Sequence, residues 1–346
     1  MSILKYHDLV TPFLQPKIAF HMEHVLRLKD SLVISPITVE IDLTDGFCNS
    51  KCGFCFFDSH QNKEKNILSK DLLFKLTEDL KNEGVKGIEF VGGGEPTLHP
   101  NFAQIVSHFS KLGFSLGLVT NGIEFDNVIP VINKFSFIRI SIDASTTETY
   151  RAIHGVDKFY DVINNINKID LKFRDRIGIG YLIVPENIYE IIPAAKFFSE
   201  LGVRFIQFRP ASLKDNPLAK HVKDIRDQID TAKSNYKESC FQVFDAGVKW
   251  NNIQSGRMYQ KCSTSTLVAV IKANGDIPLC VLNRNNNEKI IGNLYKSSFR
   301  DIWYSSRHGE LIKQIDIHKC RIPCKHDSYN IAVEAMERDY FHKDFV

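Results

Sequence analysis

Cys48-Asn49-Ser50-Lys51-Cys52-Gly53-Phe54-Cys55 carries three thiols at Cys-x3-Cys-x2-Cys spacing, directly after the strand-like run Ile37-Thr38-Val39-Glu40-Ile41-Asp42-Leu43. Three thiolates on one loop can bind three irons of an iron-sulfur cube and leave the fourth iron open to another ligand. A zinc site is the alternative, but a closed zinc tetrahedron usually takes paired Cys-x2-Cys units. The spacing therefore favours an iron-sulfur cluster with one open iron.

The composition indicates an ordinary globular protein. The chain has 346 residues, enough for more than one domain, with 43% hydrophobic residues, 25% charged residues and a net charge of +3. That charge is too small to predict a nucleic-acid partner. The N-terminus lacks the apolar core of a signal peptide and no long apolar run follows, so we expect a cytoplasmic protein without a membrane span. In such a compartment the eight cysteines favour metal ligands or catalytic thiols over disulfides.

Short β-branched runs alternate with amphipathic stretches from residue 37 onward. Strands are predicted at 39–43, 87–91, 115–119, 137–142, 177–184 and 205–208, with helices between them at 70–83, 102–111, 161–166, 188–200 and 220–232. Six such units in succession predict an α/β fold with a parallel sheet and right-handed crossovers. Residues 1–36 carry a helical pattern and are expected to form a cap, and the chain changes character after about residue 240.

These features resemble the radical S-adenosylmethionine (radical SAM) enzymes, whose signature has this cysteine spacing and an aromatic residue, here Phe54, before the last cysteine. The resemblance implies a partial (β/α)6 TIM-like barrel over residues 37–240. It also implies a 4Fe-4S cluster on Cys48, Cys52 and Cys55, with SAM on the open iron. In that family an electron from the cluster cleaves SAM to a 5'-deoxyadenosyl radical, which abstracts a hydrogen from the substrate.

The ends of the second and third predicted strands resemble SAM-binding motifs of this family. The run Val91-Gly92-Gly93-Gly94-Glu95-Pro96 looks like the family's GGE motif, in which Gly93, Gly94 and Glu95 would hold the methionyl amino group. Glycines allow a backbone to approach a ligand closely, and a carboxylate accepts hydrogen bonds from an ammonium. Thr120-Asn121-Gly122 resembles the usual TNG motif and adds Asn121 to the expected SAM contacts.

The fourth and fifth strand ends supply the other expected SAM contacts. The resemblance places Ser141 and Asp143 beside the ribose or carboxylate of SAM, with Arg151 as a possible carboxylate partner. Near Val184, backbone contacts to adenine are expected.

Residues with a role toward the substrate are harder to choose. Gln207 and Arg209 share one face of the last predicted strand, and Arg209 is either a substrate anchor or part of a structural salt bridge. The candidates for proton transfer lie at loops or strand ends, although the resemblance favours a structural turn at the third of them; they are Glu186, His99, His154 and Tyr181.

A second set of cysteines lies near the C-terminus. Cys262 and Cys280 flank a predicted hairpin, residues 267–271 and 277–280 joined by Asn274-Gly275, and Cys320 and Cys324 follow a predicted helix. Four thiols can hold a complete second 4Fe-4S cluster, although buried structural thiols are the alternative and His326 is a less favoured ligand.

The Cys-x12-Gly-x4-Cys unit followed by IGNL and SFRDIW resembles the auxiliary-cluster region of SPASM and twitch proteins. The full SPASM pattern has more cysteines, so a twitch domain with one auxiliary cluster, hairpin and helix, is expected over residues 241–346. Cys240 remains. It is either a buried apolar thiol or, as in radical epimerases, a hydrogen-atom donor.

We therefore predict a radical SAM oxidoreductase or epimerase that oxidises or epimerises a sugar, aminocyclitol or nucleoside-type small molecule. Modification of a ribosomally made peptide, by a thioether, a carbon-carbon crosslink or epimerisation, is the alternative substrate class. An iron-sulfur electron carrier is the alternative of another class, but it needs no SAM motifs. A flavodoxin- or ferredoxin-type electron donor is the expected protein partner.

Overall fold

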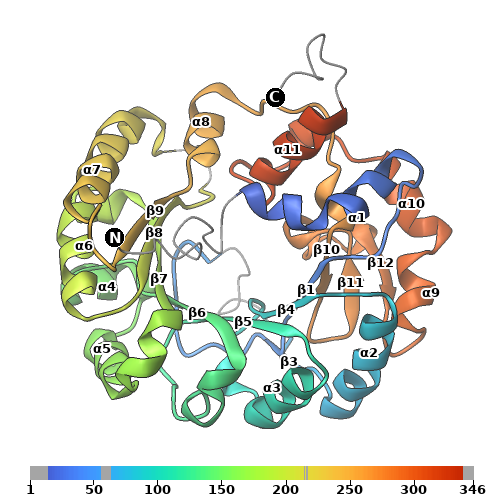
Figure 1. Ribbon diagram of the computed structural model, residues 1–346, viewed down its shortest axis with the longest axis horizontal. Helices are drawn as coiled ribbons and strands as arrows, with labels where there is room; N and C mark the ends of the chain where they lie inside the picture. The colour runs from blue at the N-terminus through green and yellow to red at the C-terminus, as the bar shows by residue number, and fades with distance from the viewer. Residues whose placement is uncertain (1–14, 56–63, 214, 216, 338–346) are drawn as a thin grey trace, which may run out of the picture.

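The computed structural model describes residues 15–55, 64–213, 215 and 217–337. The first fourteen residues of the predicted N-terminal cap lie outside this part. One parallel sheet forms a curved, partial barrel (Figure 1), with the strand order β10 (Val268–Ile271), β1 (Thr38–Ile41), β4 (Gly87–Phe90), β5 (Ser115–Thr120), β6 (Phe135–Ser141), β7 (Ile177–Ile183), β8 (Phe205–Pro210) and β9 (Gln242–Asp245). The six strands predicted from the sequence are confirmed as β1 and β4 to β8.

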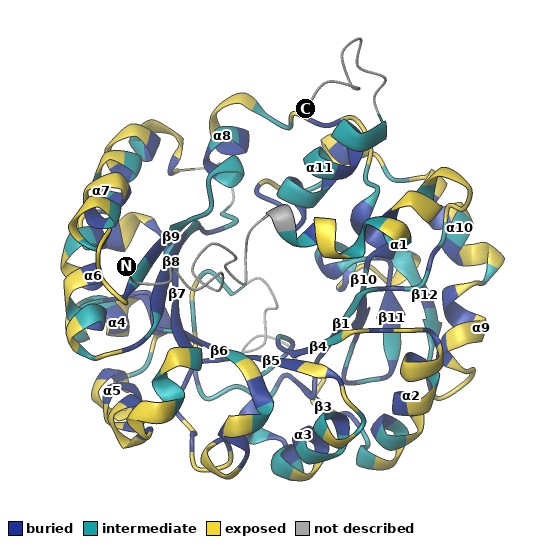
Figure 2. Cartoon of the chain, in the orientation of Figure 1, coloured by how far each residue is buried: buried dark blue, intermediate teal, exposed yellow. Residues whose placement is uncertain are grey.

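Helices cover the outer face of this sheet (Figure 1). They are α2 (Lys70–Asn82), α3 (Phe102–Lys111), α4 (Thr147–His154), α5 (Phe159–Lys168), α6 (Ile191–Glu200) and α7 (Val222–Asn235). Figure 2 shows each helix buried toward the sheet and exposed on its other side, as an amphipathic pattern requires. Among the described helices, none combines the length and the apolar character needed to cross a membrane.

Alternation along the strands places polar side chains inside the barrel. Val39 and Ile41 of β1 belong to the apolar core under the helices, so Glu40 between them faces the interior. By the same alternation, Arg139 of β6 lies between the core residues Ile138 and Ile140 and also points inward. The barrel interior is therefore charged, whereas the layer between sheet and helices is apolar.

Glycines on inward-facing positions make room for large neighbours. A Cβ atom at Gly178 of β7 would lie 2.0 Å from the ring of Phe205, its partner on β8. A Cβ at Gly180 would lie 3.1 Å from the Arg139 side chain. These positions accept only glycine without a shift of the neighbouring side chain.

The C-terminal segment departs from the predicted hairpin. β10 does not pair with the run that follows it: it adds in parallel to β1, with Val39 opposite Ala269. The next strand, β11 (Asp276–Pro278), pairs instead with β12 (Ile290–Asn293) in an antiparallel ribbon. Hydrogen-bonding groups on the free edge of β1 provide the better partner for β10. Since β9 and β10 both follow residue 240, the main sheet extends past the predicted domain boundary.

Three segments stand at the open side of the barrel, between β9 and β10. They are α8 (Val248–Ser255), α11 (Asp327–Glu337) and the N-terminal turn η2 (Gln15–His21), which continues into α1 (Met22–Leu26). Apolar side chains of the N-terminal segment and α11 share one small core, which includes Ile18, Val25 and Val333. Beyond the ribbon, α9 (Phe299–Trp303) and α10 (Ser306–Lys313) pack against the main core.

We predict opposite effects of two glycine-to-alanine substitutions. Gly178→Ala should lower the free energy of unfolding by about 1–3 kcal/mol, because the new methyl group overlaps the Phe205 ring. Gly309→Ala should raise it by about 0.5–1 kcal/mol, because Gly309 lies within α10 with open space around it. Chemical denaturation of both variants checks this, and a stable Gly178→Ala would contradict the packing described here.

Candidate functional site

The cysteine loop lies at the C-terminal end of β1 and is held from two sides. On one side, the backbone N–H of Lys51 donates to the carbonyl of His154 (2.8 Å) and that of Gly53 to the carbonyl of Ile153 (3.3 Å), both at the end of α4. On the other side, the N–H of Glu95 donates to the carbonyl of Phe47 (2.7 Å). The loop is thus fixed before any ligand binds.

The two expected SAM-binding glycines pack directly against the start of this loop. A Cβ at Gly94 would lie 2.3 Å from the carbonyl oxygen of Phe47, and one at Gly93, where φ is +74°, would lie 2.7 Å from that of Thr44. The glycines therefore have a reason to be present that does not depend on SAM, because no larger residue allows this approach.

Glu95 is buried and its carboxylate already accepts hydrogen bonds from the protein. Oε1 accepts from the hydroxyls of Thr120 (2.6 Å) and Thr97 (2.8 Å), and Oε2 accepts from the N–H of Asn121 (2.8 Å). Glu95 thus joins the ends of β4 and β5. A contact from Glu95 to the amino group of SAM remains a prediction, and the structure adds this second role.

Asn121 and Cys48 are brought together by these contacts. The side-chain amide of Asn121 donates to Oδ1 of Asn49 (2.6 Å) and lies 3.8 Å from the sulfur of Cys48. Burial, together with the nearby Glu95 carboxylate, raises the pKa of Cys48 to about 12. The ligand form of this residue, the thiolate, therefore needs a metal cation to replace its proton.

Cys52 is connected to the end of β6 through His154. Nδ1 of His154 lies 3.1 Å from the sulfur of Cys52, and Nε2 lies 2.6 Å from the carbonyl oxygen of Ile142 and 3.3 Å from a carboxylate oxygen of Asp143. Burial lowers the pKa of His154, but Asp143 and Cys52 outweigh it and raise that pKa to about 10. Asp143 has φ of +56°, a left-handed backbone that aspartate tolerates better than most residues. The sequence gives no local signal of the contact between His154 and Cys52, because the two residues are 102 positions apart.

Phe54 and Val184 meet in a small apolar cluster. Its members come from the cysteine loop, α4 and the ends of β7 and β8: Phe54, Ile153, Leu182, Val184, Ala211 and Leu213. Asn187, which sequence analysis did not select, fixes this corner. Its amide nitrogen donates to the carbonyls of Asp143 (2.8 Å) and Leu182 (2.9 Å), while its oxygen accepts from the N–H of Val184 (2.9 Å). An apolar cluster at the strand ends suits contact with an adenine ring.

The other candidates for SAM contact or proton transfer are placed less closely together. Ser141 ends β6 and Glu186 is exposed just after β7. Arg151 forms an ion pair with Asp157 (2.6 Å) and 59% of its side chain is exposed.

Besides His154, two candidates for proton transfer are buried. His99 uses both ring nitrogens within the protein, one at 3.0 Å from the carbonyl of Leu68 and one accepting from the N–H of Asn101 (3.0 Å), which indicates a structural role. Tyr181 lies within the apolar core under the helices.

Three of the four C-terminal cysteines, Cys280, Cys320 and Cys324, lie in electrostatic range of the fourth, Cys262. The charge of Cys262 raises the pKa of both Cys280 and Cys320. The charges of Cys280 and Cys262 likewise raise the pKa of Cys324. Burial is the larger cause at each of these three sites. All eight thiols of the chain are free, and Cys324 has a backbone N–H that donates to the carboxylate of Asp327 (2.8 Å). Three free thiols in electrostatic range of a fourth suit a four-thiolate cluster.

Two cations, the buried Arg284 and the more accessible Lys325, tie these cysteines to β1. Arg284, four residues after Cys280, forms an ion pair with Asp42, and both side chains are at most 2% exposed. Lys325, the residue after Cys324, lies 2.5 Å from a carboxylate oxygen of Glu40 and 2.7 Å from one of Glu89. The auxiliary segment is therefore bonded to the strand that leads into the first cysteine loop.

Cys240 lies away from both cysteine groups. It precedes β9 and its carbonyl accepts from Arg204 (2.8 Å), which precedes β8, so it stands at the N-terminal ends of parallel strands. The cysteine loop and the other expected SAM contacts stand at the C-terminal ends. Cys240 is exposed in a shallow pocket of about 320 Å³. This placement argues against the predicted hydrogen-atom donor and against the buried thiol.

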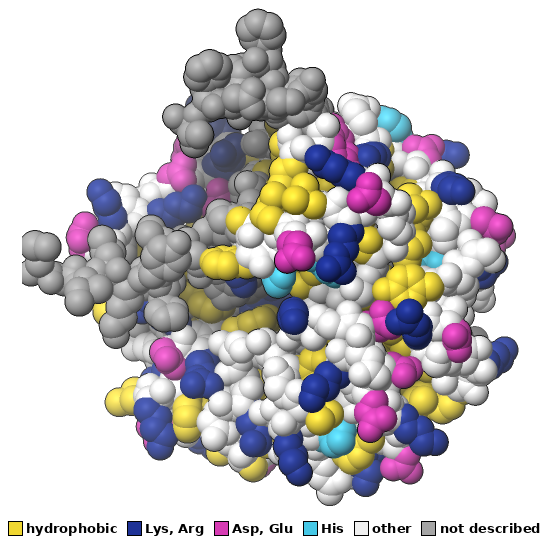
Figure 3. Space-filling model, turned by 45° about the vertical axis from the view of Figure 1, so that its right-hand side comes forward, with side chains coloured by type: hydrophobic (Ala, Val, Ile, Leu, Met, Phe, Trp, Pro, Cys, Tyr) yellow, Lys and Arg dark blue, Asp and Glu magenta, His cyan; other side chains and the backbone are white. Residues whose placement is uncertain are grey.

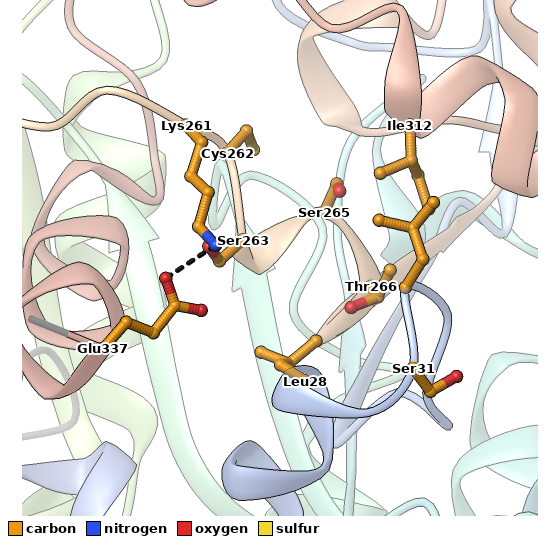
Figure 4. A pocket seen from close by; sticks show the side chains of 10 residues that line it. Leu28, Ser31, Lys261, Cys262, Ser263, Ser265, Thr266, Ile312 and Glu337 are labelled. Atoms are coloured by element: carbon orange, nitrogen blue, oxygen red, sulfur yellow. Dashed lines mark ion pairs between the residues drawn. The ribbon is translucent and has the colours of Figure 1, made fainter.

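A small pocket lies beside Cys262 (Figure 4). It has a volume of about 70 Å³, and the ion pair between Lys261 and Glu337 (2.6 Å) crosses one side of it. Ser263, Ser265 and Thr266 also line it. The volume holds a few waters and no molecule of the size of SAM. The face shown in Figure 3 mixes both signs of charge.

Within the described residues, no three or more His, Cys, Asp or Glu side chains are grouped so as to hold a single metal ion. Both cysteine sets nevertheless fit the larger groups expected from the sequence. The first is a loop of three free, partly accessible thiols beside glycines and polar strand ends, and the second is a group of four thiols.

Comparison with known proteins identifies the class. The model of the radical SAM superfamily matches residues 44–198, and that of the SPASM iron-sulfur cluster-binding domain matches residues 262–325. The chain is a radical SAM protein with a C-terminal SPASM-type domain, and such proteins bind SAM and 4Fe-4S clusters.

Similar proteins differ in what they act on. A tungsten-containing aldehyde ferredoxin oxidoreductase cofactor-modifying protein of Pyrococcus furiosus is 25% identical over 291 residues, 75% of this chain and 79% of that protein. A probable GTP 3',8-cyclase of Saccharolobus islandicus is 27% identical over 53% of this chain and 61% of its own length. The crystal structure of Streptococcus suis SuiB bound to SAM has a TM-score of 0.69 at 17% identity, covering 93% of this chain and 79% of that one.

We predict that breaking the ion pair between Arg284 and Asp42 is costly. Arg284→Met leaves a buried carboxylate without its partner and should lower the free energy of unfolding by about 3–5 kcal/mol. The double variant Arg284→Met/Asp42→Leu should recover most of that loss, since no charge stays buried alone. Anaerobic denaturation of the single and double variants measures the coupling, and additive effects would contradict it.

Alkylation tests the assignment of all eight cysteines. In protein reconstituted with iron and sulfide, iodoacetamide should modify Cys240 alone, because it is exposed and the other seven are expected to be cluster ligands. Mass spectrometry after protease digestion locates the adduct, and Cys240→Ser serves as the control that should acquire none. Adducts on the C-terminal cysteines would contradict their assignment.

Proposed function

We propose that this protein oxidises a carbon centre of a small-molecule substrate, of the sugar, aminocyclitol or nucleoside type. One observation carries the choice of oxidation over epimerisation: the only cysteine left over from the two proposed cluster sites, Cys240, stands at the opposite end of the strands from the expected SAM contacts. An epimerase of the kind considered from the sequence needs a thiol beside the substrate.

The ligand assignments complete the proposal. Cys48, Cys52 and Cys55 would hold the SAM-binding cluster, and Cys262, Cys280, Cys320 and Cys324 the auxiliary cluster. When bound, these groups supply the hydrogen-abstracting 5'-deoxyadenosyl radical and a nearby acceptor for the electron that an oxidation releases.

The residues of the chain orient and enclose these groups. Gly93 and Gly94 pack against the start of the cysteine loop and remain proposed contacts of the methionyl amino group, and the side-chain amide of Asn121 lies 3.8 Å from the sulfur of Cys48. Phe54 and Val184 offer the apolar corner for adenine. Asp143 and Ser141 remain the proposed partners of the ribose or carboxylate, with Arg151 and Glu186 as outer candidates. Arg209 is the proposed substrate anchor inside the barrel.

A peptide substrate is the second candidate. The fold is similar to that of SuiB, which has been crystallised with its precursor peptide SuiA; that structure has a TM-score of 0.69 at 18% identity. The likeness to GTP 3',8-cyclases instead supports a nucleotide-sized substrate. A flavodoxin- or ferredoxin-type protein is the proposed electron donor for either.

Iron content and SAM cleavage test the proposal. After anaerobic reconstitution, wild-type protein should bind about eight irons and cleave SAM to 5'-deoxyadenosine with dithionite. The variant Cys48→Ala/Cys52→Ala/Cys55→Ala should bind about four irons and cleave none. The variant Cys262→Ala/Cys280→Ala is the matched control, expected to lose the other cluster.

An iron content of about four that persists in the first variant, without cleavage of SAM by the wild type, would instead favour the electron-carrier alternative.

A further inference from the structure

Two cations in the barrel interior have no carboxylate of their own. Arg209 is on β8, and Lys249 is the second residue of α8. They are brought near each other by the backbone: the N–H of Ala246 donates to the carbonyl of Phe208 (3.2 Å), and the N–H of Lys249 donates to the carbonyl of Ala246 (2.8 Å). Both side chains are half-buried, so they are enclosed but accessible.

The nearby carboxylates are already engaged. Glu89, whose negative charge raises the pKa of Arg209, forms an ion pair with Lys325 (2.7 Å). Oδ1 of Asp143 accepts from the N–H of Leu182, and Oδ2 lies 3.3 Å from Nε2 of His154.

Asp327, whose negative charge raises the pKa of Lys249, accepts hydrogen bonds from the hydroxyl of Tyr259 (2.8 Å) and from the N–H of Cys324 (2.8 Å). Among the described residues, no ion pair reaches Arg209 or Lys249.

Placing two cations together with little solvent disfavours their charged forms, and the pKa values of Arg209 and Lys249 are both lowered. Burial, followed by the charge of Arg139, lowers the pKa of Arg209 to about 9. Burial, followed by the charge of Arg209, lowers the pKa of Lys249 to about 7. Like charges in a partly enclosed space repel each other and lose hydration, and an anion placed between them removes both costs.

Two further polar atoms lack a partner in the same region. Oε1 of Gln207, which shares the inward face of β8 with Arg209, is enclosed and has no hydrogen-bond partner among the described residues, and the same holds for Nε of Arg209. Gln207 is 5% exposed. Lys325, close by, keeps 38% of its side chain accessible, so solvent reaches this part of the interior.

We propose that Arg209 and Lys249 form an oxyanion site that binds a carboxylate or phosphate group of the substrate, with Gln207 accepting a hydrogen bond from a neighbouring hydroxyl or amine. The planar guanidinium can bind two oxygens of one such group, and the ammonium adds a point charge. This inference rests on the proposed function and narrows it, because it selects acidic or phosphorylated substrates over neutral ones.

The auxiliary cluster is a second source of negative charge that could balance the two cations, because the charge of Cys324 also raises the pKa of Lys249. The carboxylate of SAM is a third. The experiment therefore measures three quantities on each variant: affinity for an added anion, affinity for SAM, and the reduction potential of the auxiliary cluster.

The probes are inorganic phosphate and acetate, titrated by calorimetry into full-length protein reconstituted under anaerobic conditions. Arg209→Gln and Lys249→Gln should each weaken binding of at least one probe by about 10- to 100-fold, the range for a lost charge-assisted hydrogen bond. Arg209→Lys should weaken it less, since it keeps the charge and loses the fork. Lys196→Gln, an exposed lysine of α6, is the control of equal charge change and should bind as wild type does.

Three results would overturn the site. These are probe binding that is unchanged in Arg209→Gln and Lys249→Gln, a loss of SAM affinity as large as the loss of probe affinity, and a shifted auxiliary-cluster potential in Lys249→Gln with unchanged probe binding. Failure of the proposed function is distinct, because it appears in the wild type as missing SAM cleavage whatever the probes do. Thermal unfolding of each variant confirms that it is folded.

Discussion

The ammonium of Lys325, held between the carboxylates of Glu40 and Glu89, is the interaction on which the arrangement of the two cysteine groups depends. Two carboxylates side by side inside a barrel repel each other, and a cation between them is the arrangement that makes them compatible. That cation comes from the residue after Cys324. The carboxylate of Glu40 therefore requires the auxiliary segment to be docked against β1. The nearby ion pair of Arg284 with Asp42 is a second link between the auxiliary segment and this part of the chain.

The interior of this barrel is charged where closed (β/α)8 barrels are filled with branched apolar side chains. Glycines at Gly178 and Gly180 leave space for Phe205 and Arg139, and Lys325 pairs with Glu40 and Glu89. A polar interior contributes less to stability than an apolar one. It provides instead the fixed charges that orient a substrate.

The cysteine loop illustrates how much of the site is set before any cofactor binds. Hydrogen bonds from Lys51 and Gly53 to the end of α4, and the close approach of Gly94 to Phe47, fix the loop backbone. The thiol of Cys48 stays protonated in this state, as its high pKa indicates. Loading of the cluster therefore exchanges protons for iron in a site whose backbone is already in place.

The sequence by itself determined the class of protein, the six strands β1 and β4 to β8, and the two groups of cysteines, because each depends on local spacing or on the alternation of apolar residues. It did not determine the parallel addition of β10 to β1, the contact of Cys52 with His154, or the location of Cys240. Nor did it show Arg284 opposite Asp42, 242 positions away, or Lys325 opposite Glu40, 285 positions away. These contacts depend on which strand edges and which charged side chains come together in the folded chain. The sequence around a charged residue does not indicate a partner that lies hundreds of positions away.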